Sequence, residues 1–136
     1  MTYNVSNTDF KISSYPGISL LSRTAGIDGT SATTTNLCTV PTGRMVVVVM
    51  ALVRPTTLTG FVTTATAGIG VAAGEADIFA AVALTGLSST TVAYAFQQTA
   101  LTFAVAQSTD VIKLGIDVGY VATTATLTVE LIGYLI

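Results

Sequence analysis

The chain lacks histidine and tryptophan, and it contains a single cysteine. Without histidine, neither a Ser-His-Asp nor a Cys-His catalytic arrangement can form, and the commonest acid–base group at neutral pH is missing. One cysteine, Cys38, excludes an intrachain disulfide and cannot supply a typical zinc site. We therefore expect no catalytic residue, no metal and no cofactor, and we interpret Cys38 as a small buried strand residue.

Charge is scarce as well. Only 9% of the 136 residues are charged, against roughly 25% in an ordinary soluble domain. The net charge is −2, and the five basic residues are scattered singly. Proteins that bind nucleic acid directly usually carry a basic arm or patch, so we expect no direct binding to nucleic acid. A membrane surface is an equally poor partner for such a chain.

Hydrophobic residues make up 51% of the sequence, yet no segment has the properties of a membrane span. The apolar run Met45–Val53 has less than half of the roughly 20 residues that a transmembrane helix needs. A domain of about 150 residues buries only around 70% of its unfolded surface. Some apolar surface must therefore meet another molecule, which favours an assembly role over catalysis. The polar start of the chain has no secretion signal, so we expect synthesis in a reducing cytoplasm.

Two regions differ in character. Residues 1–17 are mostly polar, contain Tyr3, Phe10 and Tyr15, and end in the turn signal Pro16-Gly17. We interpret them as an extended N-terminal arm, with the three aromatic residues as candidates for docking on another protein. Residues 18–136 show no break in composition and are predicted to form a single domain.

That domain has the patterns of strands. Alternating apolar residues between 92 and 96, between 112 and 118 and between 127 and 131 indicate strands with one face on a core. Further strands are predicted at 18–24, 33–40, 44–53 and 58–66, with Pro55-Thr56-Thr57 ending the third; residues 75–84 are either a short helix or an irregular strand. About eight strands predict an antiparallel β-sandwich of the jelly-roll type, with an immunoglobulin-like sandwich as the nearest alternative.

The run of four valines at 46–49 is the strongest single strand signal, because β-branched side chains favour strands. It does not alternate with polar residues, so both faces of this strand are expected to be covered. We expect the core on one side and a neighbouring subunit on the other. The candidate subunit-interface residues are Val46, Val47, Val48 and Val49.

Few other residues suggest a catalytic or ligand-binding site. Two pairs of carboxylates, Glu75 with Asp77 and Asp110 with Asp117, could serve a hydrolase or a calcium site, although solvated loop positions or subunit salt bridges explain them better. Tyr120 is the best aromatic candidate for a carbohydrate site, and local packing is the simpler explanation for it.

Four segments resemble small structural proteins of tailed bacteriophages. A turn of the form VP-x-G-[KR] opens an apolar strand, and the chain ends in a strand with a G-Y-L-I tail. The segments are TVPTGR (39–44), MVVVVMALVRPT (45–56), AAVALTGL (80–87) and TATLTVELIGYLI (124–136). The resemblance spans residues 18–136 and is to capsid decoration (cement) and head-fibre proteins. It implies a β-sandwich or jelly-roll trimer on the capsid exterior.

From these observations we expect a virion structural protein without enzymatic activity. The first hypothesis is a homotrimeric decoration protein that binds the major capsid protein through Tyr3, Phe10 and Tyr15 and stabilises the capsid from outside. The alternative is a trimeric tail-fibre domain that binds a receptor or glycan. A small hydrolase that depends on Glu75 and Asp77 is a third, weaker hypothesis.

Overall fold

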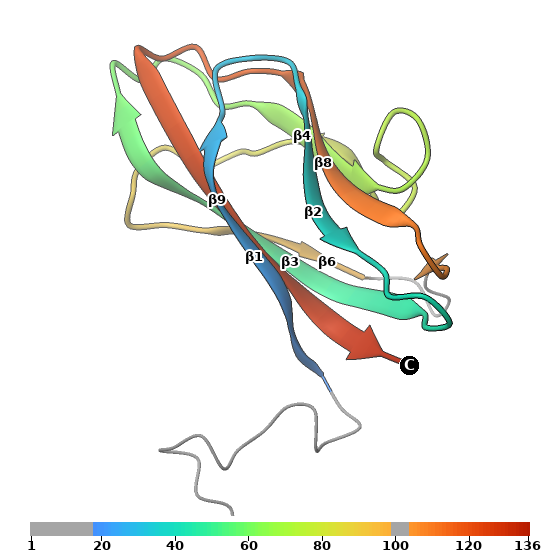
Figure 1. Cartoon of the computed structure of the whole chain (residues 1–136). Coiled ribbons are helices and arrows are strands. Elements are labelled where there is room, and N and C mark those ends of the chain that lie inside the picture. The colour runs from blue at the N-terminus through green and yellow to red at the C-terminus, as the bar shows by residue number, and fades with distance from the viewer. Residues whose placement is uncertain (1–17, 99–103) are drawn as a thin grey trace, which may run out of the picture.

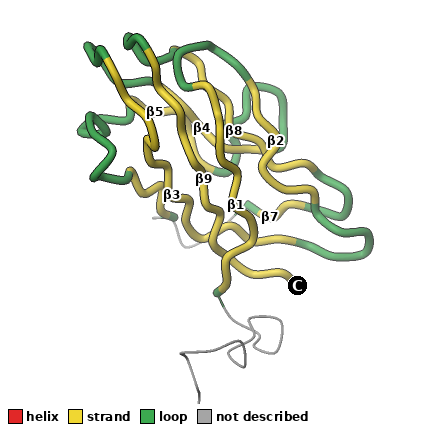
Figure 2. Tube along the Cα trace, turned by 60° about the vertical axis from the view of Figure 1, so that its left-hand side comes forward, coloured by secondary structure: helices red, strands yellow, loops and turns green. Residues whose placement is uncertain are grey.

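The computed structural model describes residues 18–98 and 104–136, which form two antiparallel β-sheets packed face to face (Figure 1). Within these ranges the chain contains strands, turns and loops but no helix (Figure 2). The strands are β1 (Ser19–Asp28), β2 (Thr34–Thr39), β3 (Val46–Thr59), β4 (Thr66–Gly70), β5 (Phe79–Ala83), β6 (Tyr94–Gln97), β7 (Val105–Ala106), β8 (Val111–Val118) and β9 (Thr124–Leu135). The predicted all-β sandwich is confirmed.

The order of the strands is that of a jelly roll. The first sheet has the order β1-β9-β3-β6, and the second has the order β2-β8-β4-β5. The short strand β7 pairs with β3 beyond the end of β6, on the same edge, so that β6 and β7 share one strand position. Along the chain the eight positions alternate between the two sheets except at β4 and β5, which are consecutive in the second sheet, as in a jelly roll, and they do not match the immunoglobulin arrangement.

Strand β3 is longer than the sequence predicted. The prediction that Pro55-Thr56-Thr57 ends this strand is wrong, because Pro55 lies within β3 opposite Leu127 of β9. A register shift between Pro55 and Thr57 marks a bulge, which is where a sheet tolerates proline. The predicted strand 58–66 is also wrong: β3 ends at Thr59 and β4 begins only at Thr66.

Of the two alternatives for residues 75–84, the irregular strand is right. Strand β5 covers Phe79–Ala83, and its pairing with β4 slips between Ala67 and Ile69. Tertiary packing overrides the helix propensity of this segment, because pairing with β4 places Phe79 in the buried layer between the two sheets. No helix in the described part of the chain combines the length and the hydropathy needed to cross a bilayer.

The core lies between the two sheets, and alternation along the strands supplies it. In β9, Leu127, Val129 and Leu131 are fully buried, and in β8 Ile112 and Leu114 are as well, as their spacing predicted. On one side, β1 and β2 approach each other closely enough for the Thr24 hydroxyl to donate a hydrogen bond of 3.5 Å to the Leu37 carbonyl. On the opposite side the sandwich is bounded by β5 and β6, and each of these strands pairs with other described strands along one edge only.

Candidate assembly surfaces

The outer face of the first sheet is unusually apolar. Residues directly opposite each other on paired strands share a face. Leu20 of β1 lies opposite Ile132 of β9, which lies opposite Met50 of β3. Because the neighbours of Ile132 on β9 are buried, this row faces outward. Leu20 is 48% exposed, so a large aliphatic side chain lies in solvent where a sandwich normally carries a polar one.

A second apolar row runs parallel to the first. Val47 of β3 lies between Tyr134 of β9 and Val105 of β7, and Val105 is well exposed. Together the two rows form a surface that we call the apolar face. It consists of Leu20, Val47, Met50, Val105, Ile132 and Tyr134.

Among the described residues, charged side chains lie at both ends of the apolar face. In the next row Arg23 of β1 lies opposite Glu130 of β9, and Arg54 follows further along β3. At the other end, Met45 and Ile136 exchange two backbone hydrogen bonds and both remain exposed. Arg44 lies at this end too, and its Nε donates a hydrogen bond of 3.0 Å to the Ile136 carbonyl, so the apolar face has charged residues at both ends.

The four candidate interface valines divide between the two sides of β3. Val46 and Val48 are only 1% and 0% exposed, so they belong to the core. Val47 and Val49 are half-buried on the outer side. The subunit-interface prediction therefore stays a prediction for Val47 and Val49, whereas Val46 and Val48 have no surface to offer a neighbour.

A second apolar cluster, which sequence reasoning missed, lies at one end of the sandwich. The loops that follow β3 and β8 meet there, and the Val62 amide donates a hydrogen bond of 2.7 Å to the Val121 carbonyl. Phe61, Val62 and Val121 are all exposed, Val62 to 66%. We call these three residues the loop-end cluster. Their signal in the sequence is bulky apolar residues beside turn glycines, which strand patterns do not detect.

Tyr120 packs inside, next to this cluster. Its ring is almost fully buried and lies edge-on to Phe61 at 6.2 Å, and its hydroxyl donates a hydrogen bond of 2.7 Å to the Leu87 carbonyl. Burial raises the pKa of Tyr120 to about 12. The expectation of local packing is confirmed, so Tyr120 is not an exposed carbohydrate platform.

The candidate carboxylates have structural positions. Asp77 accepts hydrogen bonds from the Val71 and Ala72 amides at 2.7 and 3.2 Å, which closes the turn segment before β5. Asp110 accepts from the Gln107 amide at 2.8 Å just before β8, whereas Asp117 lies near the far end of β8. Seven residues of strand separate this second pair by about 23 Å, beyond the separations that glycosidases use.

Cys38 lies on β2 as predicted but is only half-buried. Desolvation raises the pKa of its thiol, which disfavours the reactive thiolate. Within residues 18–98 and 104–136, no group of three or more cysteine, aspartate or glutamate side chains is placed to bind a metal ion. The predicted arm residues Tyr3, Phe10 and Tyr15 lie outside the described residues.

Comparison with solved structures gives a structural likeness. A chain of the solved structure described as "Cyanophage Pam1 capsid asymmetric unit" is similar over 88% of this chain and 86% of that chain, with 16% sequence identity and a TM-score of 0.48. No protein-family model matches the sequence. No curated protein matches it either.

Proposed function

We propose that this chain is a bacteriophage structural protein, a homotrimeric decoration (cement) protein that binds the outside of the capsid. The observation that carries the proposal is the apolar face on the first sheet. An outward-facing sheet surface built from Leu20, Val47, Met50 and Ile132 gains stability when a neighbouring copy covers it. The sequence resemblance to decoration proteins supports the viral setting.

The mechanism is mechanical. Each square ångström of apolar surface that a trimer removes from water contributes about 25 cal/mol. A trimer that spans neighbouring capsid subunits then holds them together against outward pressure from the packed genome. Low charge suits this role, because interface centres are depleted in charged residues. We propose no catalytic step, since Asp77 and Asp110 accept structural hydrogen bonds from backbone amides and Asp117 lies far from Asp110.

A second candidate function follows from the loop-end cluster. Receptor-binding domains place their contact residues in loops at one end of a rigid sandwich. Phe61, Val62 and Val121 form such an exposed group, which favours the tail-fibre alternative or a contact with the capsid itself. The two functions differ in partner: a fibre domain binds cells or glycans as an isolated protein, and a decoration protein binds capsids.

The test has two parts. Native mass measurement of the purified chain gives the oligomeric state, and co-sedimentation with expanded capsids gives the partner. Leu20→Lys places a charge at the edge of the apolar face and is expected to dissociate the trimer. Thr34→Lys is the matched control, because Thr34 is also exposed on an edge strand but lies on the other sheet.

A trimer that Leu20→Lys dissociates and Thr34→Lys leaves intact, together with capsid binding, supports the proposal. A stable monomer that does not sediment with capsids overturns it. Binding to cell-surface saccharides, lost in Val62→Ser and retained in Leu20→Lys, identifies the fibre function instead.

A further inference from the structure

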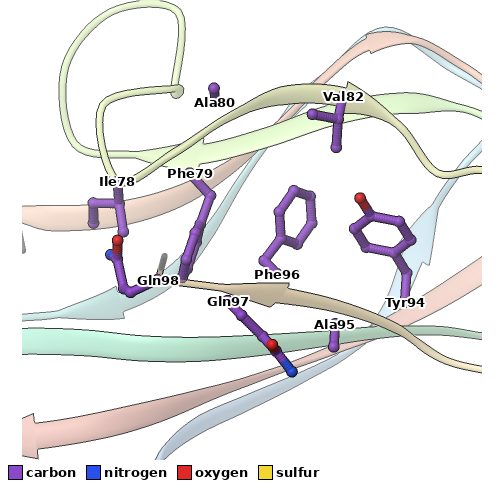
Figure 3. Close-up of a pocket in the computed structure, with 9 residues that line it drawn as sticks. All are labelled: Ile78, Phe79, Ala80, Val82, Tyr94, Ala95, Phe96, Gln97 and Gln98. Carbon is purple, nitrogen blue, oxygen red and sulfur yellow. The ribbon is translucent and has the colours of Figure 1, made fainter. Parts of the chain in front are cut away.

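The side of the sandwich bounded by β5 and β6 is open. Between these two strands lies a groove of about 480 Å³. Phe79 and Val82 of β5 and Tyr94 and Phe96 of β6 point toward one another across it (Figure 3). The Phe96 ring lies 5.5 Å from that of Phe79 and 5.1 Å from that of Tyr94, so the floor of the groove is aromatic.

Both strands that border the groove are unprotected edges. Among residues 18–98 and 104–136, strand β5 pairs only with β4, and β6 pairs only with β3. Neither strand contains a charged residue or a proline, the usual devices that prevent another strand from pairing with an edge. The groove therefore offers free backbone groups beside an apolar floor, which together are what an added extended segment requires.

The N-terminal arm has a sequence that matches this groove. In an extended strand, Phe10 and Ile12 point to one side, while Asp9, Lys11 and Ser13 point to the other. Asp9 and Lys11 are the only charged residues of the arm, so a strand over residues 8–14 buries two apolar side chains and leaves both charges in water. The charges of Asp9 and Lys11 therefore stay hydrated when the segment binds the uncharged groove.

The connection between the arm strand and β1 is short. With residues 8–14 in a groove, only residues 15–18 lead to Ser19, and these five Cα–Cα steps span at most about 17 Å. Within one chain, the connection has to cross three strand spacings, about 14 Å, from β1 to β6 and then turn into the groove, which stretches it fully across the turn signal Pro16-Gly17. A second copy whose groove lies beside β1 accepts the same segment without this stretch.

We infer that residues 8–14 of one copy add as a strand in the groove between β5 and β6 of an adjacent copy, with Phe10 and Ile12 on its aromatic floor. This inference rests on the proposed homo-oligomer and names a second contact within it. It also leaves Tyr3 free for the proposed docking on the capsid. The groove and the apolar face then form two independent interfaces of one assembly.

Hydrogen exchange on the full-length protein tests the occupancy of the groove. The double variant Phe10→Glu with Ile12→Glu is expected to exchange backbone amides of Phe79–Ala83 or Tyr94–Gln97 at least about tenfold faster than the unmodified chain. The matched control exchanges the two charges on the opposite side of the arm strand, Asp9→Lys with Lys11→Asp. Protection unchanged in the control and lost in the double variant supports the inference. Equal exchange in both variants and the unmodified chain overturns it and assigns any protection to another segment.

Crosslinking identifies which copy supplies the arm. In a Cys38→Ala background, a chain with Phe10→Cys is mixed with a chain with Val82→Cys and treated with a short bis-maleimide reagent. A covalent heterodimer, reduced when Ala83→Cys replaces Val82→Cys, is expected, because Ala83 does not line the groove. In a separate sample, each chain carries both cysteines. If this sample crosslinks only within single chains and the mixture gives no heterodimer, the adjacent-copy assignment is wrong.

Different results would contradict the proposed function and the proposed position of the arm. Loss of the trimer in Leu20→Lys with no arm crosslink removes this inference and keeps the proposed function. A monomer that protects its own groove removes the homo-oligomer itself.

Discussion

Gly68 of β4 pairs with Gly115 of β8, and the backbone at Glu75 lies directly over this pair. A Cβ atom at Gly68 would lie 2.9 Å from the Glu75 carbonyl oxygen, and one at Gly115 would lie 2.8 Å from the Glu75 Cβ. Because neither glycine has a side chain, the turn segment before β5 can pack closely against the outer surface of the second sheet. Glu75 itself has a φ of 45°, an uncommon conformation for a residue with a side chain.

Gly68→Ala is therefore expected to destabilise the protein by about 1–3 kcal/mol, because the new methyl group meets backbone atoms that cannot rotate away. Gly29→Ala is the comparison, since its methyl group would meet only side-chain atoms, of Leu127 and Tyr120, and at the longer distance of 3.2 Å. Urea unfolding of both variants measures the difference. An equal free energy of unfolding for the two would contradict the close approach at Gly68.

Asp77→Ala is expected to loosen the same turn segment without unfolding the sandwich. Its carboxylate accepts from two backbone amides, Val71 and Ala72, and both lose that partner. Hydrogen exchange should increase at these two amides and stay unchanged in β9. Asp77→Asn retains an acceptor oxygen and is expected to restore most of the protection.

Tyr120→Phe removes the buried hydrogen bond to the Leu87 carbonyl and leaves that oxygen unpaired. We expect a loss of about 1–2 kcal/mol in the free energy of unfolding. Thermal or urea denaturation measures it. Tyr134→Phe is a suitable control, because Tyr134 lies half-exposed on the outer side of β9. Similar losses in both variants would show that the Tyr120 hydrogen bond contributes little.

Alkaline pH is expected to destabilise the fold through the same residue. The pKa of Tyr120 is raised to about 12 in the folded protein from the ordinary value of 10.0, because burial disfavours the phenolate. The unfolded chain therefore loses this proton first. The contribution to stability is complete below pH 10 and disappears as the pH rises toward 12. Tyr120→Phe should flatten this part of the stability profile; an unchanged profile would assign it to other groups.

The two sides of β3 give a further prediction. Val48→Ala should cost about 1–3 kcal/mol in stability, because it opens a cavity in the core, whereas Val47→Ala should change stability little in the isolated chain. If the apolar face is a subunit contact, Val47→Ala instead weakens association, which concentration-dependent light scattering detects. Equal effects of the two substitutions on stability would contradict the assignment of sides.

Period-two patterns predicted most of β8 and β9, because one face of each strand packs on the core. The exception is Val118, which the alternation placed on the same face as Ile112 and Leu114 but which is 60% exposed at the end of β8. The same reasoning failed at Pro55, where pairing with β9 carries the strand through a bulge that no local signal announces. It also could not divide the valines of β3, because four identical side chains do not say which pair faces inward. The loop-end cluster escaped notice because its members come together only when distant loops meet.

Composition and alternation by themselves determined the all-β sandwich class, the poor supply of catalytic groups and the surplus of apolar residues that needs a partner, whereas the strand order decided between the jelly roll and the immunoglobulin-like alternative. The first three follow from residue types and local spacing. Tertiary structure decided where that surplus lies. Strand pairing set Leu20, Ile132 and Met50 in one outward row, and the separation of β5 from β6 opened an aromatic groove. Both surfaces depend on register and sheet order, which arise from contacts between residues far apart in the chain.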